Sequence, residues 1–128
     1  MLTLLKAEAT RLIGTGPVFP VPDVAASVAF YCDVLGFDLD FVMDEPPSHG
    51  SVTSGGVGVQ FTRSTDAFLS REYPGWTYIF VDGIDALYAR YRSQGVEITR
   101  PLESHEHGMR EFEIQDLDGF RLRFGQYL

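Results

Sequence analysis

The stretch Gly75-Trp-Thr-Tyr-Ile-Phe-Val-Asp-Gly83 predicts a β-strand that leads directly into the start of a helix. Successive side chains of a strand point to opposite faces, so Trp76, Tyr78 and Phe80 share one face. The other face carries β-branched residues, as is typical of a core. The three rings stand about 6–7 Å apart along the strand. What this aromatic row contacts is the main functional question of the sequence.

A regular series of elements follows the aromatic strand. Asp82 or Gly83 caps a helix that ends at Gly95 and has one apolar stripe, formed by Ile84, Leu87, Tyr88 and Tyr91. Residues 96–99 form a strand, which we expect Pro101 to end. Residues 109–115 and 120–124 then form a hairpin around an Asp-Leu-Asp-Gly loop.

The same series occurs earlier in the chain, over residues 17–62. A short strand over 18–21 precedes a helix that Asp23 caps and Gly36 ends, then a strand over 37–43 and a glycine-turned hairpin over 51–61. The matched positions include Val21 with Val81, Val24 with Ile84, and Tyr31 with Tyr91. The chain therefore contains two copies of a βαβββ module, each of which would expose a sheet face without the other.

The predicted domain organisation follows from this repeat. Residues 17–128 form one domain, with a first module over 17–62, a linker over 63–74 and a second module over 75–128. Residues 1–16 form an amphipathic arm, helical over 2–13, which docks either on its own domain or on a partner subunit. A length of 128 residues suits a single domain with one core.

Charge and composition restrict the classes of partner. With 18 acidic and 10 basic residues, the net charge of −8 repels phosphate backbones, so we expect no nucleic-acid partner. The same charge attracts cationic small molecules, or it serves solubility alone. The single cysteine, Cys32, excludes an internal disulfide. No apolar run reaches a membrane-spanning length, and the first residues lack the pattern of a signal peptide, so we expect a cytoplasmic protein with no membrane partner.

The sequence resembles the vicinal oxygen chelate superfamily, which includes glyoxalase I, extradiol dioxygenases and bleomycin resistance proteins. The motifs that carry the resemblance are Val21-Pro-Asp23, Phe30-Tyr31, Val34-Leu-Gly-Phe37, Val81-Asp-Gly-Ile-Asp-Ala-Leu-Tyr88, Gly108-Met-Arg-Glu-Phe112 and Asp116-Leu-Asp-Gly119. The match favours the bleomycin resistance branch. It implies an α+β fold in which two βαβββ modules form incomplete barrels, with helices outside and a concave ligand cleft inside.

The resemblance also identifies the positions at which metal-dependent relatives hold their ion. These positions fall on Gly16, Gln60, Trp76 and Arg123. Glycine and tryptophan side chains cannot ligate a metal, glutamine is a poor ligand and arginine is a cation. We therefore expect no metal and no other cofactor. The only other cluster with ligand chemistry is His105-Glu106-His107, which is either a weak metal site or a polar loop before a strand.

The parity of the last hairpin predicts which residues face the cleft. Phe112, Ile114, Leu122 and Phe124 must face the core together, which places Glu113 opposite Arg123 and requires a loop longer than two residues, with Gly119 left-handed. The predicted ligand-binding residues are Trp76, Tyr78, Phe80, Gln60, Glu111, Glu113, Arg121 and Arg123. Aromatic rings flanked by charges suit a flat or cationic ligand.

Three functions remain open at this level. The first is a metal-free homodimeric binding protein that sequesters a partly aromatic or cationic small molecule, such as a bleomycin-family antibiotic. The second is a lyase, isomerase or dioxygenase of the same superfamily, with Glu111 or Glu113 as base and Arg123 as electrophile. The third is a non-catalytic module that binds a metabolite or regulatory signal. In bleomycin resistance proteins the clefts lie between two subunits, which is why the resemblance implies a homodimer.

Overall fold

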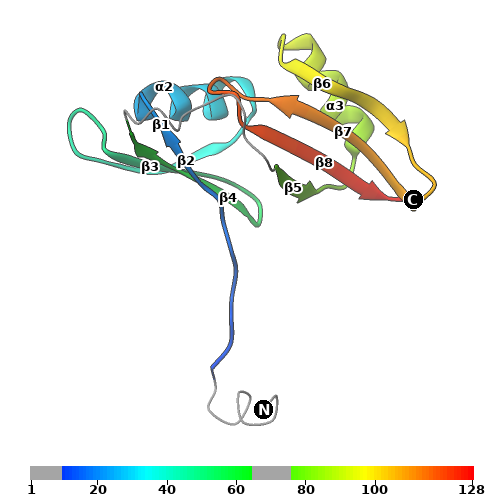
Figure 1. Cartoon of the computed structure of the whole chain (residues 1–128), viewed down its shortest axis with the longest axis horizontal. Helices are drawn as coiled ribbons and strands as arrows, with labels where there is room; N and C mark the ends of the chain where they lie inside the picture. Colours follow the sequence, from blue (N-terminus) through cyan, green and yellow to red (C-terminus); the bar gives the residue numbers. More distant parts are fainter. Residues whose placement is uncertain (1–9, 65–75) are drawn as a thin grey trace.

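The computed structural model describes residues 10–64 and 76–128, which form two four-stranded sheets with helices packed against them (Figure 1). The first sheet has the order β1-β4-β3-β2. Its elements are β1 (Val18–Val21), α2 (Val24–Ala29), a π-helical segment (Phe30–Val34), β2 (Asp38–Met43), β3 (His49–Ser54) and β4 (Val57–Arg63).

The second sheet repeats this arrangement with the order β5-β8-β7-β6. Its elements are β5 (Thr77–Phe80), α3 (Ile84–Ser93), β6 (Glu97–Ser104), β7 (Met109–Gln115) and β8 (Arg121–Tyr127). In both sheets the first strand pairs in parallel with the last, and the other neighbours are antiparallel. The predicted α+β fold of two βαβββ modules is confirmed.

The helix ends follow the residues that the sequence offers. The Asp23 carboxylate accepts a hydrogen bond from the amide of Ala26 at 3.1 Å, which caps α2. Gly83 occupies the equivalent position before α3 with φ +80° and supplies no side chain. Here the Gln126 side-chain oxygen accepts from the amide of Ile84 at 2.9 Å, so β8 caps the helix of its own module.

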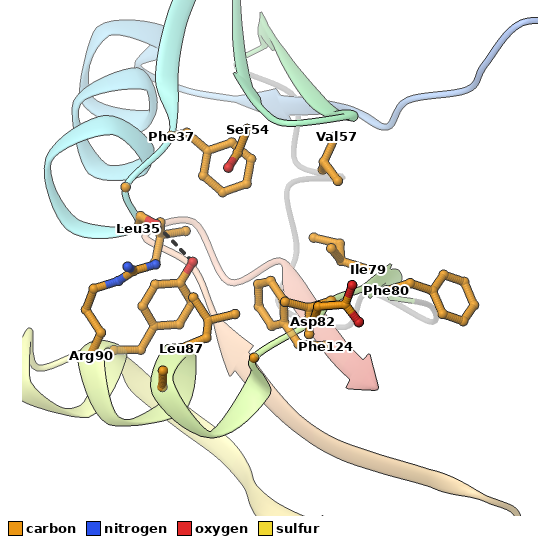
Figure 2. Close-up of a pocket in the computed structure, with 15 residues that line it drawn as sticks. Leu35, Phe37, Ser54, Val57, Ile79, Phe80, Asp82, Leu87, Arg90 and Phe124 are labelled. Atoms are coloured by element: carbon orange, nitrogen blue, oxygen red, sulfur yellow. Dashed lines mark hydrogen bonds between the residues drawn. The ribbon is translucent and has the colours of Figure 1, made fainter. Parts of the chain in front are cut away.

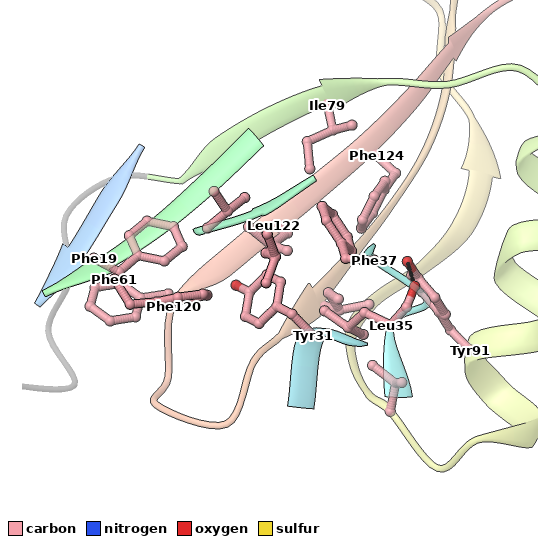
Figure 3. Close-up of a cluster of buried hydrophobic side chains, with 14 of the residues drawn as sticks. Phe19, Tyr31, Leu35, Phe37, Phe61, Ile79, Tyr91, Phe120, Leu122 and Phe124 are labelled. Atoms are coloured by element: carbon pink, nitrogen blue, oxygen red, sulfur yellow. Dashed lines mark hydrogen bonds between the residues drawn. The ribbon is translucent and has the colours of Figure 1, made fainter. Parts of the chain in front are cut away.

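The two modules share one continuous hydrophobic core (Figure 3). One group of rings lies towards β1 and consists of Phe19, Tyr31, Phe61 and Phe120. In the second group, Tyr91 of α3 packs against Phe112 and Phe124 of the sheet. Tyr31 and Tyr91 are the largest fully buried side chains. The matched helical tyrosines therefore anchor the two halves of the core.

Both tyrosines also bond across the boundary between the modules. The Tyr31 hydroxyl donates to the Asp116 carboxylate at 2.6 Å, and the Tyr91 hydroxyl donates to the carbonyl oxygen of Leu35 at 2.9 Å. A buried hydroxyl without a partner would cost free energy, so these two bonds favour one relative placement of the modules.

Two sequence-based expectations need correction. Pro101 does not end its strand: β6 continues to Ser104, with register shifts along its pairing with β7, and it lies at the edge of its sheet, where proline is tolerated. Residues 10–13 are not helical, while the remainder of the predicted helix over 2–13 lies outside the described residues. In β2, which the sequence predicted as a strand, all six residues are exposed. Within the described residues no helix is long and apolar enough to cross a membrane.

Candidate functional site

Each sheet has one face against its helix and one face that points away from it, here called the open face. In the second sheet the register pairs Ile114 with Leu122 and Glu113 with Arg123, as parity predicted. Gly119 has φ +93° in the Asp116–Gly119 loop, as expected. Ile79 is buried between its exposed or half-buried neighbours, which places the aromatic row of β5 on the open face.

The centre of this open face is an arginine held between an indole and a buried carboxylate. The guanidinium carbon of Arg123 lies 4.2 Å from the centroid of the Trp76 ring. The same guanidinium donates to Glu113 at 2.8 and 3.2 Å. Thr99 on β6 donates to the other carboxylate oxygen at 2.7 Å. Three strands, β6, β7 and β8, therefore contribute to one polar chain across the sheet, and Trp76, the residue before β5, lies at its end.

Glu113 is only 1% exposed, which makes its partners decisive for its charge. Burial raises the pKa of this carboxyl, but the hydrogen bonds from Thr99 and Arg123 and the positive charge of Arg123 outweigh burial, and the pKa lies below its usual value. Glu113 is therefore ionised at neutral pH and holds Arg123 in place.

A second interaction crosses β8 from β5 to β7. Tyr78 donates a hydrogen bond to Glu111. Between them lies Gly125, which pairs with Phe80 on one side and with Glu111 on the other. A Cβ atom at residue 125 would overlap the Tyr78 phenol, so only glycine lets this ring pass close to the backbone of β8.

This contact shifts the titration of both groups. Burial and the bond to Glu111 raise the pKa of Tyr78 to about 12. Burial raises the pKa of the Glu111 carboxyl. The hydrogen bond from Tyr78 and the neighbouring His107 lower this pKa by more than burial raises it, so the net shift is downward. At neutral pH the pair is therefore a neutral phenol donating to a carboxylate.

Two imidazoles from the β6–β7 turn flank the same carboxylate. The Nε2 atoms of His105 and His107 each lie 3.6 Å from a Glu111 oxygen, on different oxygens. The two rings stack with centroids 5.3 Å apart. Glu111 therefore has polar groups on both sides, but no Arg or Lys is within ion-pair distance among the described residues.

The outer end of the aromatic row is an exposed ring pair. Phe80 stacks on Tyr127 with centroids 5.6 Å apart, and Tyr78 lies 5.0 Å from Phe80. Trp76, Phe80 and Tyr127 are 49%, 60% and 71% exposed. Exposed large rings in a contiguous group are typical of a binding surface.

The predicted ligand-binding residues do not all come together. Seven of the eight lie on the second sheet, where Arg121 is half exposed with its guanidinium 4.0 Å from Glu113. Gln60 lies on the open face of the first sheet, where its amide oxygen is 2.7 Å from the Nε2 atom of His49. It lines a separate cavity of about 420 Å³ beside Gly16 and Ser51.

The residues present do not fit a metal centre of the kind implied by the fold family. Trp76 and Arg123, two of the four matched positions, contact each other as a cation and an aromatic face, and neither offers a lone pair to a metal. Within residues 10–64 and 76–128, no three His, Cys, Asp or Glu side chains are arranged to hold a metal ion.

Sequence reasoning missed Thr99, Gly125 and Tyr127. Glycine inside the strand pattern Arg-Leu-Arg-Phe-Gly was a usable signal, because such a glycine often marks a close approach of another group. Tyr127 shares the parity of Arg121 and Arg123 and could have been placed on the open face. Thr99 could not, because a register shift separates it from the regular alternation.

Comparison with known proteins agrees with this architecture. The sequence model of the glyoxalase/bleomycin resistance protein/dioxygenase superfamily matches residues 15–124. The bleomycin-binding protein of bleomycin-producing Streptomyces verticillus, solved with copper(II)-bleomycin, superposes with a TM-score of 0.74 at 26% identity, over 90% of this chain and 96% of that one. TioX from Micromonospora sp. ML1 superposes with a TM-score of 0.74 at 23% identity, over 90% of this chain and 100% of TioX. A glyoxalase/bleomycin resistance protein/dioxygenase from Alicyclobacillus acidocaldarius superposes with a TM-score of 0.73 at 21% identity, over 90% of this chain and 92% of that one. No curated protein sequence matches the chain.

Proposed function

The chain belongs to the glyoxalase/bleomycin resistance protein/dioxygenase superfamily, and on this premise we propose that it sequesters a partly aromatic, cationic small molecule without a metal of its own. The ligand class is that of the bleomycin antibiotics. The observation that carries the proposal is the open face of the second sheet, where exposed rings adjoin the Glu111 carboxylate, which has two imidazoles beside it but no Arg or Lys among the described residues within ion-pair distance.

The aromatic part of the ligand would stack on Trp76 and on the Phe80–Tyr127 pair. Arg123 covers one face of the indole, and Trp76 remains 49% exposed. A stacked ring contributes roughly 0.5–1.5 kcal/mol beyond the area that it buries. Glu113 fixes Arg123, so this surface is formed before the ligand arrives and little ordering accompanies binding.

The cationic part of the ligand would pair with Glu111. This carboxylate is ionised at neutral pH and has a phenol and two imidazoles as neighbours. Glu113, by contrast, is already neutralised by Arg123. A net charge of −8 further attracts a cation and makes the association rate dependent on salt.

We propose further that the protein is a homodimer, because apolar side chains of a single chain are left uncovered. Leu12 and Ile13 are 93% and 87% exposed, and the chain before β1 leads away from both sheets towards residue 10 in Figure 1. Leu39, Phe41 and Met43 on β2 are also exposed. A second copy that covers these groups would enclose an open face as a cleft.

A calorimetric titration with metal-free bleomycin tests the proposed function. We expect saturable binding near micromolar affinity that weakens as salt is raised. Glu111→Gln should weaken binding at least about tenfold, which corresponds to one charge pair of about 1.4 kcal/mol. The exposed Glu103→Gln is the matched control and should change affinity less than about twofold. Equal affinity of wild type and Glu111→Gln would contradict the assigned cation site.

Metal analysis addresses the enzymatic alternative. Protein purified without chelator should contain no stoichiometric divalent ion, because the matched positions carry no ligating set. One divalent ion per chain would overturn the metal-free assignment and favour a lyase, isomerase or dioxygenase.

A further inference from the structure

The two ends of the boundary between the modules are built differently, although the repeat would make them alike. At one end the β7–β8 turn of the second module reaches the helix of the first. Asp116 accepts from Tyr31 at 2.6 Å, and Asp118 accepts from Ser27 at 2.6 Å. Phe120 stacks on Phe19 with centroids 4.3 Å apart. This turn fills its end of the boundary with a ring and two carboxylates.

The matched turn of the first module is smaller. Ser54 pairs with Val57 across β3 and β4, just as the amide of Asp116 bonds to the carbonyl of Phe120. Ser54 therefore stands where the second module has Asp116, and Val57 stands where it has Phe120. With no carboxylate to meet it, the Tyr91 hydroxyl donates instead to the carbonyl of Leu35 at 2.9 Å.

The missing volume remains as a cavity of about 400 Å³, here called the seam cavity (Figure 2). Its apolar walls are formed by Leu35, Phe37, Val57, Ile79, Leu87 and Phe124. Arg90 and Asp82 lie on opposite sides of it in Figure 2. Small-molecule sites occupy about 300–1,000 Å³ and combine apolar walls with a few polar groups, as this cavity does.

The polar groups indicate the chemistry of an occupant. Among the described residues no carboxylate is within ion-pair distance of Arg90, whose guanidinium carbon lies 5.9 Å from the centroid of the Tyr91 ring. Arginine is suited to bind a carboxylate through two parallel hydrogen bonds. Asp82 on the far side would repel a second negative charge. The cavity thus favours one carboxylate at one end of an apolar body.

We propose that the seam cavity is a second ligand site, which binds a small aromatic monocarboxylate with its ring among the apolar walls and its carboxylate on Arg90. The site goes beyond the proposed function and is separate from the open face of the second sheet. Phe80 belongs to both, since it lines the cavity and stacks on Tyr127.

Nuclear magnetic resonance of the ¹⁵N-labelled full chain tests this site with indole-3-acetate and its neutral analogue indole-3-ethanol. Indole-3-acetate should saturate at about 1 mM or below, with amide shifts at Gly36, Ser54 and Leu87 rather than at Glu111 and Arg123. Absence of saturable shifts up to about 10 mM, or shifts confined to the open face, would overturn the proposal.

Three variants separate the contributions. Val57→Phe places in the cavity the residue type of the matched position and should weaken indole-3-acetate binding at least about tenfold. Arg90→Gln should weaken the binding of indole-3-acetate about tenfold but that of indole-3-ethanol less than about twofold. This contrast remains informative if Val57→Phe fails to fold. Trp76→Leu should leave the affinity for both probes unchanged while it weakens bleomycin binding about tenfold. Equal loss of both probes in Arg90→Gln would contradict the carboxylate assignment.

Discussion

Arg123 lies with its guanidinium carbon 4.2 Å from the Trp76 ring centroid and bonds at 2.8 Å to Glu113, a carboxylate that is 1% exposed. One arginine thus neutralises a buried charge and supports the aromatic surface proposed to bind the ligand. Loss of this arginine should therefore affect stability and binding together.

Arg123→Met is expected to lower the free energy of unfolding by about 3 kcal/mol, because it leaves the Glu113 carboxylate buried without its cation. Urea denaturation measures this change. Arg121→Met, which removes a half-exposed guanidinium 4.0 Å from the same carboxylate, should cost about 0.5 kcal/mol or less. Adding Glu113→Gln to Arg123→Met should recover part of the loss. No recovery would show that the buried charge is not the cause.

Gly125→Ala is expected to lower the free energy of unfolding by about 1–3 kcal/mol, because the new methyl group would displace Tyr78 from Glu111. Gly56→Ala, which faces open space without a positive φ, is the matched control and should be nearly neutral. Combining Gly125→Ala with Tyr78→Ala removes the clash, so the double variant should lose less than the sum of the two single changes. Additive losses would contradict the proposed packing.

Asp116 should make the protein less stable as pH rises from about 4 to about 7. Burial raises the pKa of its carboxyl to about 6, against the hydrogen bonds from Tyr31 and two backbone amides, while Asp118 raises it further. An acid with a raised folded-state pKa favours folding fully below its unfolded pKa and loses that contribution as pH passes the folded value. The contribution amounts to up to about 3 kcal/mol.

Urea unfolding of wild type and Asp116→Asn across this range measures the effect. Glu111 and Glu113 have lowered pKa values, and their contribution to stability is lost as pH falls below about 4. Wild type and Asp116→Asn share these groups, so the difference between their two curves of stability against pH isolates the contribution of Asp116. A constant difference between pH 4 and pH 7 would contradict the raised pKa.

Sedimentation equilibrium should give the mass of a dimer. Leu12→Ser combined with Ile13→Ser should shift the equilibrium towards monomer without changing the unfolding of the domain, because both side chains are exposed in a single chain. A wild-type monomer at all concentrations would contradict the homodimer, as would a dimer that the double variant leaves unchanged.

Most of the fold could be predicted from the sequence, because the repeat fixes the order of the elements and the strand parity fixes which side chains share a face. The pairing of Glu113 with Arg123 followed from placing Ile114 and Leu122 on the same side, and the loop conformation at Gly119 followed from that pairing. The continuation of β6 through Pro101 did not follow, because the position of a strand within its sheet decides whether proline is tolerated.

The candidate site was less accessible from sequence. Trp76, Tyr78 and Phe80 were placed on the open face by alternation alone. The contact of Tyr78 with Glu111 was not predicted, because it skips a strand and depends on Gly125. The seam cavity was not predicted either, since it depends on the packing of Val57 against the opposite module, although the matched residue Phe120 signalled a difference in volume.

The most direct test of the account is a fluorescence titration with metal-free bleomycin, since Trp76 is the only tryptophan of the chain and lies in the proposed site. We predict a saturable change in emission with a midpoint near micromolar ligand, weakened at least about tenfold by Glu111→Gln. Unchanged Trp76 emission up to about 1 mM bleomycin, from protein that is folded by circular dichroism, would contradict binding at this face.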